Sequence, residues 1–383
     1  KALERRARIG LKNLIDFDDL PLSGRYLNQL ENAGIKIENK LRWFNAVSAY
    51  LNPGEYKRVK NFEFVKAIEP VRKVKILHPT DSPPHRVLSK SRMFGLDYGP
   101  SLTQLDLSDI PVLHDLGITG KGIRIGILDS GFDWKNQKST QNANIIDEYD
   151  FVFKDNITSN EAEDNPSQHN HGTLVLSTIA GMDEGNLIGA AFDAEFVLAK
   201  TENISSETHA EEDNYAAALE WFEALGVDIS TSSLGYSEFD PTEFSYTYDD
   251  MNGKTTIVTR ACEKAFQKGM VTVTSAGNEG NSAWHYITAP GDGFNTITVG
   301  AVNYDNILAS FSSRGPTADG RIKPDIVTMG VSVFAADARL KDYAYFSGTS
   351  LSAPIAAGIC ALVLSEFPYL TNKQLRQIIL EAG

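Results

Sequence analysis

The sequence predicts an α/β fold, a mostly parallel sheet with helices on both faces, preceded by a small α+β domain. From Gly120 onward, short apolar runs alternate with amphipathic stretches, the pattern of buried parallel strands joined by helices. In residues 20–77, apolar and polar residues alternate on a shorter scale. Between the two parts, residues 78–101 hold four prolines and two glycines without a sustained period, which predicts an exposed connector.

The first part is predicted to begin with a basic helix and to continue as a compact unit. The helix is expected over residues 1–13. Alternating apolar residues and a proline at one helix start predict the unit's elements. Its helices are expected at 24–33 and 53–61, and its strands at 35–44, 46–51 and 64–77.

The second part has five predicted strands, at 123–128, 196–200, 228–232, 271–275 and 297–302. Helices are expected at 172–181, 212–225, 255–268 and 371–382. Glycines at 117, 120 and 122 precede the first strand rather than follow it, which excludes a dinucleotide-binding turn. Functional groups in such sheets collect at the carboxyl ends of the strands.

Charge is divided unevenly along the 383 residues, whose net charge is −14. Residues 1–92 carry 19 Lys and Arg against 10 Asp and Glu, and residues 93–383 carry 17 against 40, so the two parts have charges of +9 and −23. This opposition favours docking of one part on the other and argues against nucleic acid as a partner of the acidic part.

Two further features bear on where the chain works. Lys1 opens no signal-peptide pattern and no apolar run approaches the ~20 residues of a membrane span, so we expect a soluble chain from which any export signal has been removed. Cys262 and Cys360 are the only cysteines, and their apolar settings favour two buried free thiols over a disulfide.

Ser350 is the first candidate functional residue. A glycine turn at 346–349 delivers it to the start of a helix that is apolar all round and is therefore expected to be buried. The free N–H groups and the dipole at a helix start favour developing negative charge, which suits a nucleophile that attacks a carbonyl. An N-cap serine explains the same pattern.

Three polar residues follow predicted strands or begin a predicted helix. Asp129 ends the first strand, where it either caps a turn or holds an imidazole. His171 lies two residues after His169; metal binding is one alternative, although no third histidine or cysteine completes a zinc set, and we expect Gly172 to let a substrate backbone approach. Asn278 is either a turn asparagine or an amide donor to an oxyanion, worth ~3–4 kcal/mol.

These four residues carry a resemblance. Asp129 in LDSG, His171 in HGT, Asn278 in SAGNEG and Ser350 in GTSLSAP resemble the signature blocks of the subtilisin-like serine proteases, the subtilases. The resemblance covers residues 98–383 and includes the segments 232–235 and 311–316. It implies a subtilisin-like catalytic domain that needs no cofactor for its chemistry.

The resemblance also implies the roles of individual residues. Ser350 would be the nucleophile, His171 the general base and Asp129 the residue that orients it. The oxyanion would be bound by the Asn278 amide and the Ser350 N–H. Substrate backbone would pair with Ser233, Leu234 and Gly235, beside a pocket wall that includes Gly277.

Two departures from the family pattern are visible. Leu174 stands where the family has a second histidine, and Leu351 stands where many relatives have methionine, which predicts resistance to peroxide. Structural calcium is an open expectation: the loop at 183–186 is shorter than the family's calcium loop, and the acidic segments 147–164 and 207–213 are either calcium ligands or solvated faces.

Residues 25–77 resemble the inhibitor-type propeptide of subtilases, a ferredoxin-like α+β domain. We therefore expect a propeptide at 1–77 with its core at 20–77, a processing linker at 78–97 and a catalytic domain at 98–383 that ends earlier than is usual in the family. The pair Tyr98-Gly99 resembles one found just inside mature subtilases, which places the processing bond within 85–97.

The predicted function is that of a self-processing serine endopeptidase proform. It would cleave extended polypeptides through an acyl-enzyme, as a secreted or cell-envelope protein of bacterial type, with its own propeptide as inhibitor and as a monomer. Two alternatives stay open: a catalytically silent subtilase-fold binding protein, and a processing protease of narrow specificity.

Overall fold

A computed structural model describes residues 1–69, 79–84, 94–205, 210–237 and 245–382. Its centre is a seven-stranded sheet in the order β12-β11-β10-β9-β4-β8-β5, in which every pair is parallel. The strands are β4 (Arg124–Asp129), β5 (Asn144–Asp150), β8 (Glu195–Lys200), β9 (Ile229–Ser232), β10 (Val271–Ser275), β11 (Ile297–Val302) and β12 (Ile326–Met329). The predicted fold class is confirmed.

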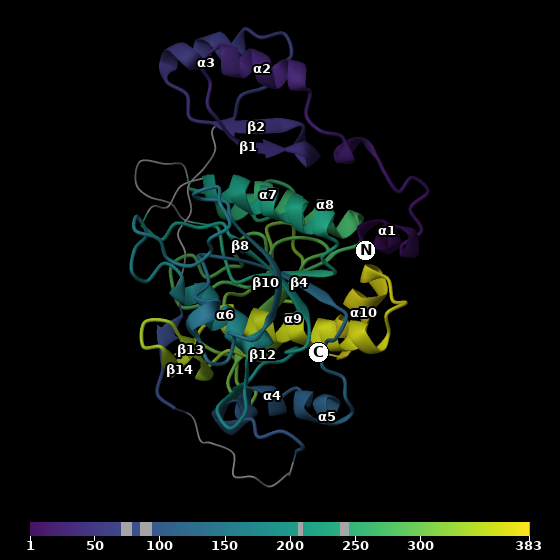
Figure 1. Cartoon of the computed structure of the whole chain (residues 1–383), viewed down its shortest axis with the longest axis vertical. Helices are drawn as coiled ribbons and strands as arrows, with labels where there is room; N and C mark the ends of the chain where they lie inside the picture. Colours follow the sequence, from purple (N-terminus) through teal and green to yellow (C-terminus); the bar gives the residue numbers. More distant parts are fainter. Residues whose placement is uncertain (70–78, 85–93, 206–209, 238–244, 383) are drawn as a thin grey trace.

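Helices cover both faces of this sheet (Figure 1). α6 (Asn170–Ala180) and α9 (Thr349–Glu366) pack on one face, and α7 (Ala210–Leu225) and α8 (Ile257–Gln267) pack on the other. Successive residues of β8 show the division: Phe196 and Leu198 join the core on the α9 side, and Val197 joins the core on the α7 side. Both faces are apolar because the alternating side chains of a strand point to opposite faces.

All five strands predicted for the second part are found, as β4, β8, β9, β10 and β11. The two edge strands, β5 and β12, were not predicted. The acidic segment 147–164 therefore begins within a strand, because residues 147–150 belong to β5. Edge strands need no continuous apolar run, and charged residues there discourage pairing with other chains.

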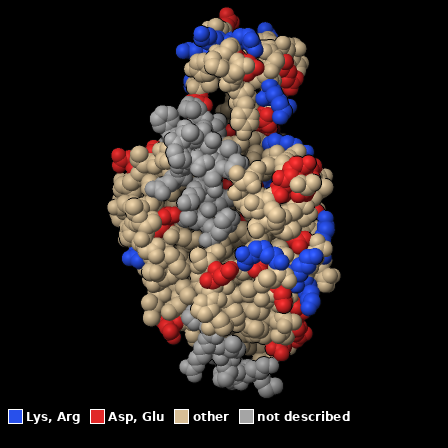
Figure 2. Space-filling view, turned by 90° about the vertical axis from the view of Figure 1, so that its left-hand side faces the viewer, with Lys and Arg blue, Asp and Glu red and all other residues tan. Residues whose placement is uncertain are grey.

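The N-terminal domain is a smaller lobe that stands on α7 (Figure 1) and forms the top of the molecule in Figure 2. It contains α2 (Gly24–Asn32), β1 (Ile37–Leu41), β2 (Ala46–Ala49) and α3 (Pro53–Lys60), with β1 and β2 antiparallel. The strand predicted for 64–77 is not found over 64–69, and residues 70–77 lie outside the described part. The first helix is shorter than predicted: α1 covers Ala2–Arg8, and the chain turns at Gly10 with φ of 79°.

The connector is partly structured, which corrects the expectation of an irregular segment. Thr80–Asp81 forms β3, which pairs with β14 (Asp342–Ser347), itself paired with β13 (Val333–Asp337). Residues 85–93, most of the expected processing segment, lie outside the described residues. The remaining elements of the described residues are α4 (Leu102–Asp106), α5 (Ile110–Asp115), the hairpin β6 (Met182–Asp183) and β7 (Leu187–Ile188), and α10 (Asn372–Ala382). Short 3-10 helices lie at η1 (Phe17–Asp19), η2 (Arg42–Phe44), η3 (Gly99–Ser101), η4 (Trp134–Asn136) and η5 (Tyr248–Asp250).

One helix among the described residues is long and apolar enough to cross a membrane: α9, which is mostly buried inside the protein. Burial of this kind is usual for the central helix of a protein core. Cys262 and Cys360 are both buried free thiols, as predicted, and burial raises the pKa of each to about 12.

Candidate active site

The four candidate residues lie at the carboxyl edge of the sheet or in the loops and helix starts that follow it. Asp129 is the last residue of β4, and Asn278 follows the end of β10. His171 lies in the first turn of α6 and Ser350 in the first turn of α9. Parallel strands all end at one edge, so residues far apart in sequence meet there.

Asp129 and His171 form a direct hydrogen bond. His171 Nδ1 lies 2.7 Å from Asp129 Oδ1, and the two side chains are 2% and 0% exposed. The same carboxylate oxygen accepts from the backbone N–H of Ser130 at 2.7 Å, which holds it in place. Because Nδ1 donates to the carboxylate, Nε2 is the ring nitrogen that is able to take up a proton.

Gly172 permits this hydrogen bond, although not in the way we expected. A Cβ at Gly172 would lie 2.2 Å from the carbonyl oxygen of Gly131 and 3.0 Å from Asp129 Cβ. The backbone that comes close to this glycine is therefore the protein's own and not that of a substrate. Without a side chain at residue 172, α6 can approach the loop after β4 closely enough for His171 to reach Asp129.

Ser350 does not cap its helix. The N-cap of α9 is Gly348, and no side chain there makes a capping hydrogen bond. Ser350 Oγ instead lies 3.3 Å from the carbonyl oxygen of Ser233, and Ser233 Oγ donates to the carbonyl of Ser350 at 2.7 Å. The N-cap explanation of this serine is therefore wrong, and the paired hydrogen bonds join the start of α9 to the segment after β9.

Asn278 is held by its side-chain oxygen. Asn278 Oδ1 accepts hydrogen bonds from the backbone N–H and the hydroxyl of Thr349, both at 2.9 Å. The amide Nδ2 therefore points to the opposite side, and it lies 3.5 Å from where a Cβ on Gly348 would be. This contact crosses from the β10 loop to α9, which argues against the simple turn asparagine.

Two of the predicted substrate-binding residues, Gly235 and Gly277, lie against Thr288. A Cβ at Gly235 would be 2.3 Å from Thr288 Oγ1, and one at Gly277 would be 2.9 Å from the same atom. Leu234 points into the core and is 1% exposed. The segment Ser233 to Gly235 therefore presents backbone rather than bulky side chains at this edge.

Sequence comparison agrees with this geometry. The profile described as the subtilase family of the S8 peptidases matches residues 120–383, more than half of the chain. The chain belongs to the subtilase family. A second profile, described as the peptidase S8 propeptide domain of Bacteroidota, matches residues 1–85 of this subtilase. Together these matches support a serine protease with an N-terminal propeptide domain, as the resemblance implied.

The individual relatives are likewise subtilisins or subtilisin-like proteinases. Subtilisin E of Bacillus subtilis is 28% identical over 358 residues, which cover 92% of this subtilase and 79% of the relative. Subtilisin of Bacillus pumilus is 32% identical over 270 residues, covering 70% and 85%. The crystal structure of a cold-adapted subtilisin-like serine proteinase superposes with a TM-score of 0.51 and 25% identity, covering 68% of this chain and 81% of that one.

An acidic cluster lies in the segment that we considered for calcium. Among the described residues, Asp150, Asp155 and Glu161 form a group whose carboxylate oxygens lie close enough to hold a metal ion. Lys200 Nζ lies 2.8 Å from Asp150 Oδ2 and 2.7 Å from Asp164 Oδ2, and its side chain is fully buried. Burial raises the pKa of Asp150 despite this ion pair. A protein-borne cation therefore already neutralises part of the cluster.

The other histidine of the pair, His169, has a separate partner. His169 Nδ1 accepts from the backbone N–H of Asn160 at 3.0 Å, and the backbone N–H of His169 donates to Asn160 Oδ1 at 2.9 Å. Burial lowers the pKa of His169. This histidine organises the acidic loop, and no histidine belongs to the acidic group described above.

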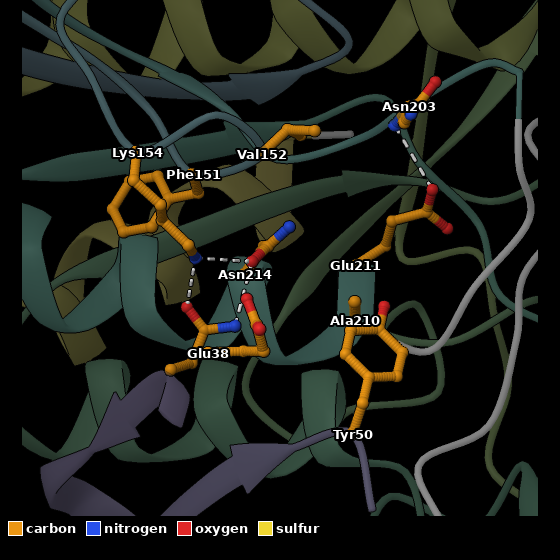
Figure 3. Close-up of a pocket in the computed structure, with 10 residues that line it drawn as sticks. Glu38, Tyr50, Phe151, Val152, Lys154, Asn203, Ala210, Glu211 and Asn214 are labelled. Carbon is orange, nitrogen blue, oxygen red and sulfur yellow. Dashed lines mark hydrogen bonds between the residues drawn. The ribbon is translucent and has the colours of Figure 1, made fainter. Parts of the chain in front are cut away.

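A cavity of about 160 Å³ lies between the N-terminal domain and the sheet domain (Figure 3), and none of the four candidate residues lines it. Lys154 Nζ donates there to Asn39 Oδ1 at 2.7 Å, and Asn39 Nδ2 donates to Asn214 Oδ1 at 2.9 Å. Burial lowers the pKa of Lys154. These polar contacts join the two domains, so the cavity is a gap in an interface.

Sequence reasoning missed two side-chain contacts within the site. The hydroxyl of Thr349 helps to hold Asn278, and the hydroxyl of Ser233 ties its segment to Ser350. Thr349 lies beside the candidate nucleophile in the quoted GTS block, a signal that could have identified it. Nothing in the local sequence predicts the Ser233 contact, which spans 117 positions.

Proposed function

We propose that this subtilase is a serine endopeptidase whose nucleophile is Ser350, with His171 as general base and Asp129 as the residue that orients it. In this proposal Ser350 Oγ attacks the peptide carbonyl while its proton moves to His171 Nε2. The proton then passes to the leaving amine and an acyl-enzyme remains, which water hydrolyses by the reverse proton path. No cofactor takes part in these steps.

The single observation that carries this proposal is the buried 2.7 Å hydrogen bond between Asp129 and His171 at the same sheet edge as Ser350. The oriented amide of Asn278 supports a second assignment. We propose that Asn278 Nδ2 and the Ser350 N–H bind the oxyanion, and that extended substrate pairs with the backbone of Ser233 to Gly235 beside Gly277.

We further propose that the chain is a self-processing proform, with a propeptide at 1–77, a linker at 78–97 and a catalytic domain at 98–383. Contacts between the domains support an intramolecular inhibitor. Glu220 on α7 accepts from the backbone N–H groups of Arg42 and Trp43, at 3.0 and 2.9 Å, and from Arg42 Nε at 3.1 Å. Such charge-assisted bonds hold one domain on the other.

The remaining assignments concern the environment of the enzyme. The bacterial relatives and the Bacteroidota propeptide support a secreted or cell-envelope protease of bacterial type, and we propose that it acts as a monomer. Calcium prefers clusters of oxygen ligands, but Lys200 already pairs with Asp150. We therefore propose that this lysine, rather than a calcium ion, stabilises the acidic segment.

The test is hydrolysis of an unstructured protein substrate and the intact mass of the purified chain. Ser350→Ala should abolish both hydrolysis and any cleavage within 78–97. Ser365→Ala is the matched control, because Ser365 lies in the same helix and donates only to the carbonyl of Leu362. If neither the parent nor the control hydrolyses protein, even after the N-terminal domain is removed, the chain is a catalytically silent binding protein instead.

A further inference from the structure

The segment that follows the N-terminal domain adds a strand beside the candidate nucleophile. β3 pairs antiparallel with β14, with Thr80 opposite Ser347 and Asp81 opposite Phe346. Ser82 N–H donates to the carbonyl of Tyr345 at 2.9 Å, and the hydroxyls of Ser82 and Ser347 lie 2.6 Å apart. An extended peptide is thus seated on the outer edge of β14.

The position and direction of β3 indicate which half of a substrate would lie along β14. A Cβ on Gly348 would lie 3.1 Å from Pro79 Cβ and 3.5 Å from Asn278 Nδ2, so Pro79 lies next to the proposed oxyanion donor. From there the segment runs antiparallel to β14, away from Ser350 as its residue numbers rise. A substrate that follows this path places its leaving half, the part after the cleaved bond, along β14.

One charged side chain on this edge contacts the seated segment. Arg339 Nη2 lies 3.3 Å from Asp81 Oδ1. The guanidinium is held in place by Asp337, whose side chain is fully buried: Arg339 Nε donates to Oδ1 at 3.0 Å and Nη2 to Oδ2 at 2.7 Å. Because the buried Asp337 carboxylate fixes the guanidinium group, Arg339 is pre-organised toward β3, the strand that pairs with β14.

We propose that Arg339 makes the edge of β14 favour substrates with an acidic residue at the third place after the cleaved bond. Asp81 occupies that place when Pro79 is taken as the first residue after the cleaved bond. The inference rests on the proposed protease function and adds a substrate class to it. Arg339 acts here as a specificity residue that contacts substrate, with no part in bond breaking.

The expected preference is modest. Arg339 and Asp81 have side chains 42% and 79% exposed, so solvent and salt screen their attraction. Exposed ion pairs of this kind change equilibria by about two- to fivefold. The preference should therefore be clear at low ionic strength and shrink toward none in about 1 M salt.

The first arm of the test needs no catalysis. In the full chain carrying Ser350→Ala, amide hydrogen exchange at Ser82 reports the pairing of β3 with β14. Asp81→Asn and Arg339→Lys should each speed this exchange about two- to fivefold. Arg321→Lys is the matched control, because Arg321 also pairs with the aspartate two residues before it but contacts Gly293 instead of β3.

The second arm measures kcat/KM of the full chain, after any processing is complete, on peptides that differ only in Asp, Asn or Lys at the third place. We expect Asp to be preferred over Lys by about two- to fivefold, with the preference reduced in Arg339→Lys, which keeps the charge but not the planar guanidinium, and lost in high salt. Hydrolysis without preference, or unchanged Ser82 exchange, would overturn this proposal. Absence of any hydrolysis would instead reject the protease function, while the exchange arm still decides the role of Arg339.

Discussion

Arg6 and Glu223 lie 217 positions apart in the sequence and form a buried ion pair of 2.8 Å. Glu223 also pairs with Arg5 at 3.0 Å, and both arginines belong to α1. Arg5 further donates to the carbonyls of Val227 and Lys268, just beyond the ends of α7 and α8, where the helix dipoles favour a cation. Residues 1–19 are thus anchored to the sheet domain independently of the lobe that stands on α7.

This anchor should depend on Glu223. We expect Glu223→Gln to take the carboxylate partner from the buried Arg5 guanidinium, at a cost of about 3–5 kcal/mol to the docking of α1, while Arg6 keeps its ion pair with Asp19. Hydrogen exchange of the α1 amides in the Ser350→Ala chain measures the loss. Glu4→Gln is the control, because Glu4 lies on the same helix with its side chain 86% exposed. Unchanged protection in Glu223→Gln would show that the backbone contacts alone hold the helix.

The docking of the N-terminal domain should weaken as pH rises. Burial raises the pKa of Asp213, a residue in the first turn of α7 that contacts Ser48 of β2, to about 6. This pKa lies above that of an unfolded aspartate, so the protonated Asp213 carboxyl favours the docked state. Its contribution to the free energy of docking is complete below about pH 4 and is lost as pH rises through 6. The full cost above pH 6 is about 3 kcal/mol.

The measurement is the stability of the docked Ser350→Ala chain at pH 5 and at pH 7.5. We expect it to be greater at pH 5, and Asp213→Asn should remove most of this difference. Asp305→Asn, at an exposed position, should leave the difference as it is. A pH dependence that survives in Asp213→Asn would assign it to other buried carboxyls, such as Glu220, whose pKa burial also raises.

Asn278 and Thr349 should act as one unit in catalysis. We expect Asn278→Ala to lower kcat about 10²- to 10³-fold with little change in KM, because an oxyanion donor acts mainly in the transition state. Thr349→Val removes one of two donors that hold the Asn278 oxygen and should lower kcat by a smaller factor. In the double variant the Thr349 change should have no further effect. Additive losses would mean that Thr349 acts separately from Asn278.

Leu351 should make the enzyme resistant to peroxide. This residue follows Ser350 directly, is fully buried, and has no thioether to oxidise. The parent should keep its activity in dilute peroxide, and Leu351→Met should lose it. Loss at equal rates in both would place the sensitive group elsewhere, for instance at Met182, which is partly exposed.

Most of the sheet could be predicted from the sequence, and the four candidate residues stay predictions whose places at strand ends and helix starts the structure shows. Buried parallel strands are continuous apolar runs, so β4 and β8 are visible in the sequence without any neighbour. β5 and β12 lie at the edges, where half of the strand meets solvent and no apolar run is required. The same reasoning missed β3, whose pairing with β14 spans 265 positions.

The sequence by itself determined which residues stand at the strand ends and helix starts, because these positions follow from local periodicity and turn chemistry. Only the tertiary structure decided what lies against them. It shows that Gly172 makes room for the backbone of Gly131, that Lys200 enters an acidic cluster, and that Arg339 meets Asp81. Each of these contacts joins segments whose separation in the chain carries no local signal, so packing of the whole fold is needed to bring them together.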